Sequence, residues 1–467
     1  MKPYLSIVAA SRNDNHNGDL DRRSQIFIDA LLAQAARHRL ETELILVEWN
    51  PPADRPSLRA SLAWPADNHW LEIRIITVGR KLHRRFAYSG RLPMFQMIAK
   101  NVGVRRARGA FVLQTNIDIV FSDALFSWIA RRALRPGVLY RCDRVDVDRN
   151  VPMHLPIDAQ LDYCAHHVLR VHRKDSTWMV PEGLNPATLS DARAPADNQP
   201  QVDALATPPS REERAFAALS RRVMEFERRS DDYLTRKSRI RAKVFEWLRV
   251  ATYGGAGLLW ITYRLAAFLA RKLGVYRLME KARGSRVFRF ALRRVPASRS
   301  HLRSLGYKPT YSQLIDDLLA PRHRIPALHT MACGDFLLTD AESWHRMRGT
   351  PELPVFSTYL DALAVITAYK VGLKVQDLPS DRVIYHIDHG TGWWTEQQTT
   401  MYRRVNKLGV PVISHGTYLR YGSRLLNGSD YFLSSVDWGL SKEALPEDVL
   451  TRFIAEHEEA RQSAEDT

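Results

Sequence analysis

Short apolar runs that end in polar residues recur through the first quarter of the chain. They lie at residues 4–10, 43–47, 73–78 and 110–114. Each run is bounded by polar or turn-forming residues and is too short for a typical helix, which predicts four buried strands. Between the first two runs, apolar residues recur at helical spacing from Ile26 to Gln34, which predicts a helix that covers the sheet. This order of elements predicts an α/β fold with a mostly parallel sheet and helices on both faces.

Polar residues follow three of these runs. Ligands of open α/β sheets bind outside the carboxyl ends of the strands, so these residues are candidates for a binding site. They are Ser11, Arg12, Asn13, Asp14, Glu48, Thr115, Asn116 and Asp118. The crowding after the first run predicts a nucleotide pocket in which Arg12 faces phosphate or base and Asp14 faces the ribose. A solvated loop is the alternative for the first group, and a helix cap is the alternative for Asp118.

The last third of the chain carries a second set of elements. Asp340 is expected to cap a helix that has Ser343 at its N3 position and ends at Gly349. Another helix is expected from Leu360 to Tyr369, with Asp361 in its first turn. The final predicted strand covers residues 383–389 and ends in His386, Asp388 and His389.

The stretch before Asp118 resembles a known family. The order Asn101, Gly103, Ala107, Gly109, apolar strand and Asn116-x-Asp118 is similar to the segment of GT-A fold glycosyltransferases that ends in their Asp-x-Asp metal motif. Residues 94–103 (MFQMIAKNVG) and the Arg12-Asn13 pair resemble the inverting β-galactosyltransferase type within that class. The resemblance covers roughly residues 2–123 and 324–390. It departs from the family at Asn116, where an amide replaces an acid and would coordinate a hard cation more weakly.

The resemblance implies a Rossmann-like GT-A fold, a nucleoside-diphosphate sugar as donor, with a UDP-sugar first, and a divalent manganese or magnesium ion. It implies that Asp118 and His386 bind the metal, with Asn116 as a further candidate ligand. The residues implied in binding the nucleotide sugar are Ser11, Arg12, Asn13, Asp14, Glu48, Lys100, Asn101 and Asn116.

The resemblance also implies a general base. Gly349-Thr350-Pro351, Asp361 and His386 stand in the order in which the β-galactosyltransferase type places its acceptor site, its base and a metal-binding histidine. Asp361 is therefore the first candidate base and Asp335 the second, although residues 356–361 replace the Trp-Gly-Gly-Glu-Asp run of that type. A single displacement would invert the anomeric carbon. Without the resemblance, Asp361 is an acid that interacts with the helix dipole, and His386 is a strand histidine bonded to a neighbour.

Acids and histidines scattered between residues 140 and 183 fit no metal-ligand spacing. They are Asp143, Asp146, Asp148, His166, His167 and His172. We expect them to be surface and loop residues.

Composition is that of an ordinary globular protein. Of the 467 residues, 45% are hydrophobic and 25% are charged, so the chain can bury a large core in two or three domains. The cysteines Cys142, Cys164 and Cys333 are far apart and odd in number, which argues against a disulfide scaffold and favours a reducing compartment. The first apolar run is too short for a signal peptide, so a cytoplasmic protein is expected.

The net charge of +17 is confined to one part of the chain. Residues 211–310 hold 25 basic and 8 acidic residues, so the remainder is neutral. Apolar residues from Phe216 to Ala251 alternate at spacings of three and four, which predicts a long amphipathic or coiled-coil helix. The apolar run Leu258–Ala270 lies among basic residues and is too short to span a bilayer, which takes about 20 residues.

These features predict peripheral attachment to the anionic inner face of the cytoplasmic membrane. A helical hairpin packed on the catalytic domain is the alternative. Nucleic acid is not expected as a partner, because the sequence contains no RRM, KH or zinc-finger module.

Four parts follow from the sequence. Residues 1–184 are expected to form the nucleotide-sugar-binding half, 185–209 a linker of disordered composition, 210–323 an inserted basic helical segment, and 324–467 the acceptor-binding half with the C-terminal tail. The predicted function is transfer of a sugar to a hydroxyl of an envelope glycan or lipid-linked sugar. The alternative is a non-catalytic GT-A-like scaffold in polysaccharide assembly. Asn116 is the feature that supports this alternative, because it replaces an acid of the metal motif.

Overall fold

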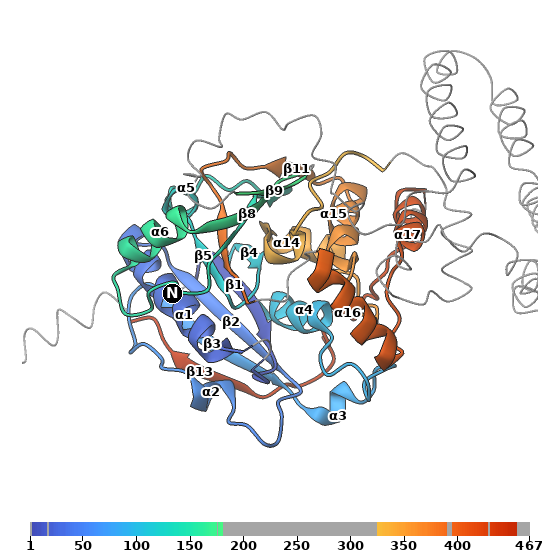
Figure 1. The fold of residues 1–467 in the computed structure, drawn as a ribbon, viewed down its shortest axis with the longest axis horizontal. Coiled ribbons are helices and arrows are strands. Elements are labelled where there is room, and N and C mark those ends of the chain that lie inside the picture. The colour runs from blue at the N-terminus through green and yellow to red at the C-terminus, as the bar shows by residue number, and fades with distance from the viewer. Residues whose placement is uncertain are drawn as a thin grey trace, which may run out of the picture. The chain divides into compact units, whose positions relative to one another are not determined.

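Two β-sheets and the helices around them make up the structure, a computed structural model that describes residues 2–15, 18–174, 176–180, 325–389, 395–427 and 430–454 (Figure 1). The larger sheet has the strand order β11-β6-β10-β4-β1-β2-β3-β13. Its strands are β1 (Leu5–Ser11), β2 (Thr42–Trp49), β3 (Leu71–Val78), β4 (Phe111–Gln114), β6 (Val138–Arg141), β10 (Leu337–Asp340), β11 (Lys374–Asp377) and β13 (Glu447–Thr451). The four strands predicted from the first apolar runs are confirmed as β1 to β4.

The α/β class is confirmed, and the larger sheet is mixed: β10 and β13 run against its other six strands. β1 pairs in parallel with β2 and β4, β2 with β3, and β6 with β11. β10 runs antiparallel to both β4 and β6, and β13 runs antiparallel to β3. The direction of β10 and β13 depends on how the last third of the chain returns to the sheet, and no local pattern encodes that path.

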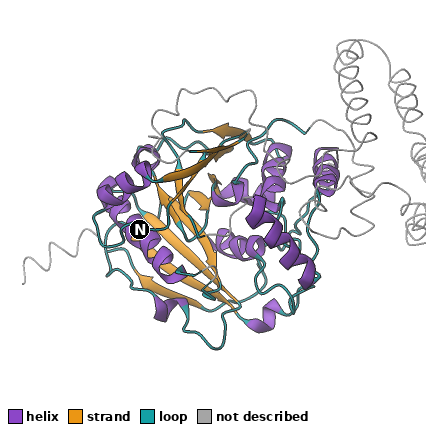
Figure 2. Ribbon diagram, viewed as in Figure 1, coloured by secondary structure: helices purple, strands orange, loops and turns teal. Residues whose placement is uncertain are grey.

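Helices cover both faces of this sheet, as expected (Figure 2). On one face, Leu5, Ile7 and Ala9 of β1 share a core with α1 (Leu20–His38) and α5 (Asp123–Ala130). On the other, Val8 and Ala10 share a core with α4 (Gln96–Arg106), α14 (Ala341–Met347), α15 (Leu360–Lys370) and α17 (His415–Asn427). Successive side chains of a strand point to opposite faces, so a strand buried on both faces is a continuous apolar run.

A smaller sheet has the strand order β5-β12-β7-β8-β9. Its strands are β5 (Ile119–Phe121), β7 (Arg144–Val147), β8 (Val168–His172), β9 (Thr177–Met179) and β12 (Ile384–Ile387), and α6 (Ile157–His166) connects β7 to β8. β12 runs antiparallel to β5 and parallel to β7. The strand expected at residues 383–389 is therefore present, but it ends before His389.

The two halves of the described chain interleave. β10 lies between β4 and β6, and β12 lies between β5 and β7, so strands of the second half are inserted among strands of the first. The expected linker at 185–209 and the expected basic segment at 210–323 lie outside the described residues. Within the described ranges, no helix combines the length and the apolar character needed to cross a membrane.

Local turn and cap chemistry follows the sequence closely in the second half. Asp340 Oδ1 accepts the backbone N–H of Ser343 at 2.8 Å, which confirms the expected cap of α14. The chain leaves this helix through Arg348 and Gly349, both with positive φ. α15 carries Asp361 in its first turn, as expected. The remaining helical elements are α2 (Leu58–Ser61), α3 (Arg80–His83), the 3-10 turn η3 (Cys333–Asp335) and α16 (Thr395–Leu408).

Candidate functional site

The strand order of the larger sheet reverses at β1, which has β2 on one side and β4 on the other. Because β4, β1, β2 and β3 are parallel, their carboxyl ends lie at one edge of the sheet. Open α/β sheets bind ligands in the crevice at such a switch point. Residues 11–14 and 115–118 leave β1 and β4 at this edge. The fold thus brings together the two polar groups that the sequence singled out.

Three side chains at this edge are placed to hold a metal ion. Asp118, His386 and His389 each offer one ligand atom, and these atoms lie within 4.8 Å of one another. The Nε2 atoms of His386 and His389 are each 3.7 Å from Oδ2 of Asp118. The register of β12 on β5 sets His386 opposite Ile119, the residue after Asp118. The cluster therefore contains both metal ligands expected from the sequence, and adds His389.

Asp118 is fixed from the helix that follows β1. Arg23 Nη1 on α1 donates to Oδ2 of Asp118 at 2.7 Å, and its Nη2 donates to the carbonyl of Gly18 at 3.1 Å. The other carboxylate oxygen of Asp118, Oδ1, is buried and accepts no hydrogen bond from the described residues. A buried lone pair without a partner is costly, which suits an oxygen that ligates a cation.

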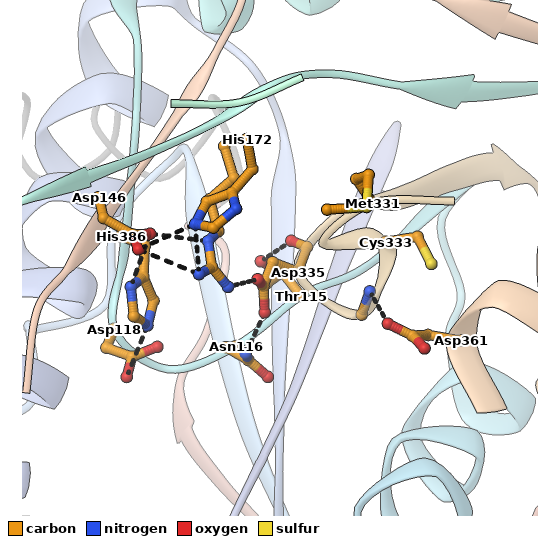
Figure 3. A network of polar contacts seen from close by, with 12 residues as sticks. Thr115, Asn116, Asp118, Asp146, His172, Met331, Cys333, Asp335, Asp361 and His386 are labelled. Atoms are coloured by element: carbon orange, nitrogen blue, oxygen red, sulfur yellow. Dashed lines mark hydrogen bonds and ion pairs between the residues drawn. The ribbon is translucent and has the colours of Figure 1, made fainter. Parts of the chain in front are cut away.

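A buried carboxylate orients His386. Asp146 Oδ1 lies 3.2 Å from His386 Nδ1, which leaves Nε2 directed at Asp118 (Figure 3). Asp146 is fully buried and also contacts Arg144, Arg170 and His172. Burial would raise the pKa of Asp146, but Arg144, the hydrogen bond with His172 and the nearby imidazole of His386 hold it far below its usual range. A carboxylate behind a metal-binding histidine fixes the tautomer and the orientation of the ring.

This arrangement corrects the expectation that Asp146 and His172 are surface or loop residues. Both are buried, on β7 and β8 respectively, whereas His166 and His167 are exposed as expected. The sequence of β7 alternates: Val145 and Val147 join an apolar core while its polar side chains face the network. A four-residue strand whose polar face is buried has the same pattern as a half-solvated one, and the prediction failed for that reason.

The pKa values of the two candidate ligand histidines shift in opposite directions. Burial and Arg144 lower the pKa of His386, but Asp118 and Asp146 raise it, and the net result lies above the usual value. Burial lowers the pKa of His389 to about 4, with Asp118 offsetting part of the effect. At neutral pH His389 therefore presents a neutral imidazole, whereas the raised pKa of His386 favours its protonated form, which competes with metal binding.

Arg144 connects this cluster to Asp335. Its Nε is 2.7 Å from Asp146 Oδ1, and its Nη1 is 2.5 Å from Asp335 Oδ2. The other oxygen of Asp335 accepts from Nδ2 of Asn116 (Figure 3). Oδ1 of Asn116 in turn accepts from Gln96 at 3.1 Å. Asn116 is thus held between Asp335 and Gln96.

The charges around Asp335 keep it ionised. Burial would raise its pKa, but Arg144, His386 and Lys100 lower it below the usual value. Both of its carboxylate oxygens are engaged by Arg144 and Asn116. Asp335 is therefore a poor proton acceptor and a firm anchor for the turn that carries it.

Lys100 and Asp361 meet at the same turn. Lys100 is fully buried, and its Nζ donates to the carbonyl of Gly334 at 2.7 Å. The N–H of Gly334 donates to Oδ2 of Asp361 at 2.8 Å. Burial lowers the pKa of Lys100 to about 8, although Asp335, Asp361 and Asp118 all raise it. Burial raises the pKa of Asp361, so this carboxylate is the more basic of the two candidates.

The residues after β1 form a polar corner. Arg12 donates to the carbonyl of Asn50 and pairs with Asp14, each at 3.0 Å, and both side chains are half-buried. Asn13 is buried, has a φ of 55° and donates to the segment at residues 56–61. Ser11 is buried and accepts the N–H of Asn13 at 3.2 Å. Arg12 and Asp14 are the members of this group with side chains open to a ligand.

Glu48 and Asn101 are engaged within the protein. Glu48 is buried and accepts the N–H of Leu58 at 2.7 Å. Asn101 is buried, and its amide makes hydrogen bonds to the backbone and hydroxyl of Thr350 and to Glu352. Both side chains hold segments of the framework in place. Contact of the predicted nucleotide-sugar residues with a ligand stays a prediction.

Sequence reasoning missed His389 as a candidate ligand, Asp146 and Arg144 as neighbours of the cluster, and Arg23 as the partner of Asp118. The position of His389, three residues after His386, was the one local indication of its role. The others are recognisable only once β7, β12 and α1 lie together. No protein-family model matches the chain, and no curated protein matches it at a significant level.

Proposed function

We propose that the protein is a metal-dependent glycosyltransferase of the GT-A type. It would move a sugar from a nucleoside-diphosphate sugar, first a UDP-sugar, to a hydroxyl of a glycan or glycolipid. The observation that supports this most directly is the cluster of Asp118, His386 and His389 at the switch point of the sheet. Asp361 lies across the Asp335 turn from that cluster (Figure 3). A cation site and a separate carboxylate are the two parts that this chemistry needs.

The donor atoms favour manganese over magnesium. One carboxylate oxygen and two imidazole nitrogens suit a transition-metal ion, whereas magnesium prefers oxygen ligands alone. When bound, the ion would neutralise negative charge on the diphosphate leaving group. The contacts of Arg23 with Asp118 and of Asp146 with His386 would keep both side chains oriented for this role.

Asp361 is a better candidate base than Asp335. Asp335 has a lowered pKa, and its two carboxylate oxygens accept from Arg144 and Asn116. Asp361 accepts backbone N–H groups and contacts Cys333, none of which carries a positive charge. Its carboxylate therefore lacks a direct ion pair like the one between Arg144 and Asp335, which makes Asp335 a weak base.

In the proposed step the acceptor hydroxyl oxygen forms a bond to the anomeric carbon of the donor sugar. Its proton passes to Asp361, and the bond from the anomeric carbon to the diphosphate oxygen breaks. The nucleoside diphosphate leaves with the bonding electrons. One displacement from the face opposite the leaving group predicts inversion at the anomeric carbon.

Titration calorimetry with manganese and UDP tests the site. Asp118→Asn keeps the size of the side chain and its contact with Arg23, and we expect it to lose metal-dependent UDP binding. Asp158→Asn on α6 is the matched control, since its side chain is 76% exposed and pairs with Arg37, which is not a member of the cluster. If folded Asp118→Asn binds UDP with manganese as the unmodified protein does, the metal site is wrong.

A screen of nucleotide sugars for slow hydrolysis then separates catalysis from binding. Release of nucleoside diphosphate from one donor, dependent on manganese and on Asp361, supports the transferase. Tight metal-dependent binding with no turnover of any donor, with or without glycan acceptors, would instead support the scaffold function.

A further inference from the structure

A basic surface lies beside α16 at the edge of the sheet that carries the metal cluster. It is formed by residues 80–91, which follow the carboxyl end of β3, and by the second half of α16. Its eight basic side chains are all exposed: Arg80, Lys81, Arg84, Arg85, Arg91, Arg403, Arg404 and Lys407. We name these residues the basic face.

The two segments of the basic face adjoin each other (Figure 1). Arg91 Nη1 donates to the carbonyl of Gly409, directly after α16, at 3.2 Å. Leu92 packs against an apolar cluster that includes Tyr402 and Val405, which lie on the buried side of α16. Because that side of the helix faces the protein, the exposed basic residues of α16 lie on its outer side.

The charge of this surface is largely unneutralised. Residues 73–117 contain no acidic residue. Arg85 pairs with Glu443 at 2.5 Å, and the other seven basic side chains make no ion pair within the described ranges of the chain. An excess of like charge on one surface raises the affinity for an anionic partner.

Two exposed apolar side chains stand among the cations. Tyr88 is 42% exposed and Leu408 is 37% exposed. A soluble polyanion provides no apolar region in which a leucine side chain could be buried. The boundary between headgroups and acyl chains of a bilayer buries leucine and accommodates tyrosine at headgroup level. Clustered lysine and arginine beside such residues match anionic lipid headgroups.

We infer that the basic face docks the protein on an anionic lipid bilayer. The carboxyl end of β3 shares its edge with those of β1 and β4, so docking turns the edge that carries Asp118 toward the lipid. This inference concerns the basic face alone, and it does not depend on the proposed transferase function.

Position-specific fluorescence on the full chain tests this. Cys142, Cys164 and Cys333 are at most 3% exposed, so a cysteine added at the surface can be labelled selectively with an environment-sensitive dye. The labelled variants are Leu408→Cys and, as control, Arg131→Cys. Arg131 is exposed in the turn before β6, which runs in the same direction as β4, so it lies at the opposite edge of the sheet. Vesicles of phosphatidylglycerol and phosphatidylcholine are compared with vesicles of phosphatidylcholine alone.

We expect the dye at residue 408 to brighten with the anionic vesicles and to be quenched by a lipid-borne quencher, while the dye at residue 131 does not respond. Reversing charge with Lys81→Glu and Arg84→Glu should weaken the response at residue 408 at least tenfold, whereas Arg131→Glu with Arg135→Glu should change it less than twofold. Vesicle binding without a response at residue 408, equal responses at both positions, or no vesicle binding would each overturn the inference.

Discussion

Lys100 offers a sharp test, because its ammonium is fully buried at the candidate site. Burial lowers its pKa from 10.5 to about 8 even though three carboxylates raise it. Each tenfold change in an acid constant is worth about 1.4 kcal/mol, so keeping this ammonium charged at neutral pH costs the folded state roughly 3 kcal/mol. Lys100→Met removes that cost with a side chain of similar volume.

The substitution also removes the hydrogen bond to the Gly334 carbonyl, and leaving a buried group unpaired costs about 1–3 kcal/mol. The two effects nearly offset each other, so we expect Lys100→Met to be as stable as the unmodified protein at pH 7, or about 1 kcal/mol more stable. Donor binding and turnover should nonetheless fall, because the variant leaves Asp118, Asp335 and Asp361 without their buried cation. A stabilising change that removes activity is the pattern of a residue retained for function.

The stability difference between the unmodified protein and Lys100→Met should depend on pH. Between pH 8 and pH 10.5 the unfolded chain binds more protons at this lysine than the folded protein does, so the unmodified protein gains stability as pH rises through that window. Urea unfolding of both proteins from pH 7 to pH 10 measures the difference in their free energies of unfolding. Titratable groups that both proteins share contribute equally and cancel in that difference. The variant's relative stability should decline above pH 8.

Lys442→Met is the control, because that lysine is 76% exposed and its change should alter stability by less than about 1 kcal/mol. The reasoning would be refuted by a Lys100→Met protein that is several kcal/mol less stable than the unmodified protein at pH 7, if this stability difference also stays constant from pH 8 to pH 10.

Four further outcomes are expected. His389→Gln should weaken manganese binding at least tenfold by calorimetry, whereas His166→Gln, an exposed histidine, should not change it. Asp146→Asn, which leaves the ligands intact, should weaken manganese binding about 10- to 100-fold through loss of the support for His386. Asp361→Asn should retain binding of UDP with manganese but lose transfer by about 10² or more, and surviving transfer would exclude Asp361 as the base. Manganese affinity should fall as pH drops below the raised pKa of His386, with one proton taken up, and a flat profile from pH 8 to pH 5 would contradict that assignment.

Local pattern determined the elements that depend on neighbouring residues alone. Leu5, Ile7 and Ala9 point to one core and Val8 and Ala10 to the other, so β1 is recognisable as a strand buried on both faces. The cap of α14 could also be predicted from the sequence, because a capping side chain bonds to a backbone group only three residues away. The placement of Asp118 at a strand end followed from the same kind of local order.

Tertiary structure alone decided the direction of β10 and the membership of the candidate site. β12 brings His386 beside Asp118 by pairing with β5, and beside Asp146 by pairing with β7. Those pairings join parts of the chain that lie far apart in sequence, and their register sets which atoms meet. Side chains at the ends of short strands carry no local mark of such partners, since the burial and charge that shift the pKa of His386 and Lys100 arise only after the sheets have assembled.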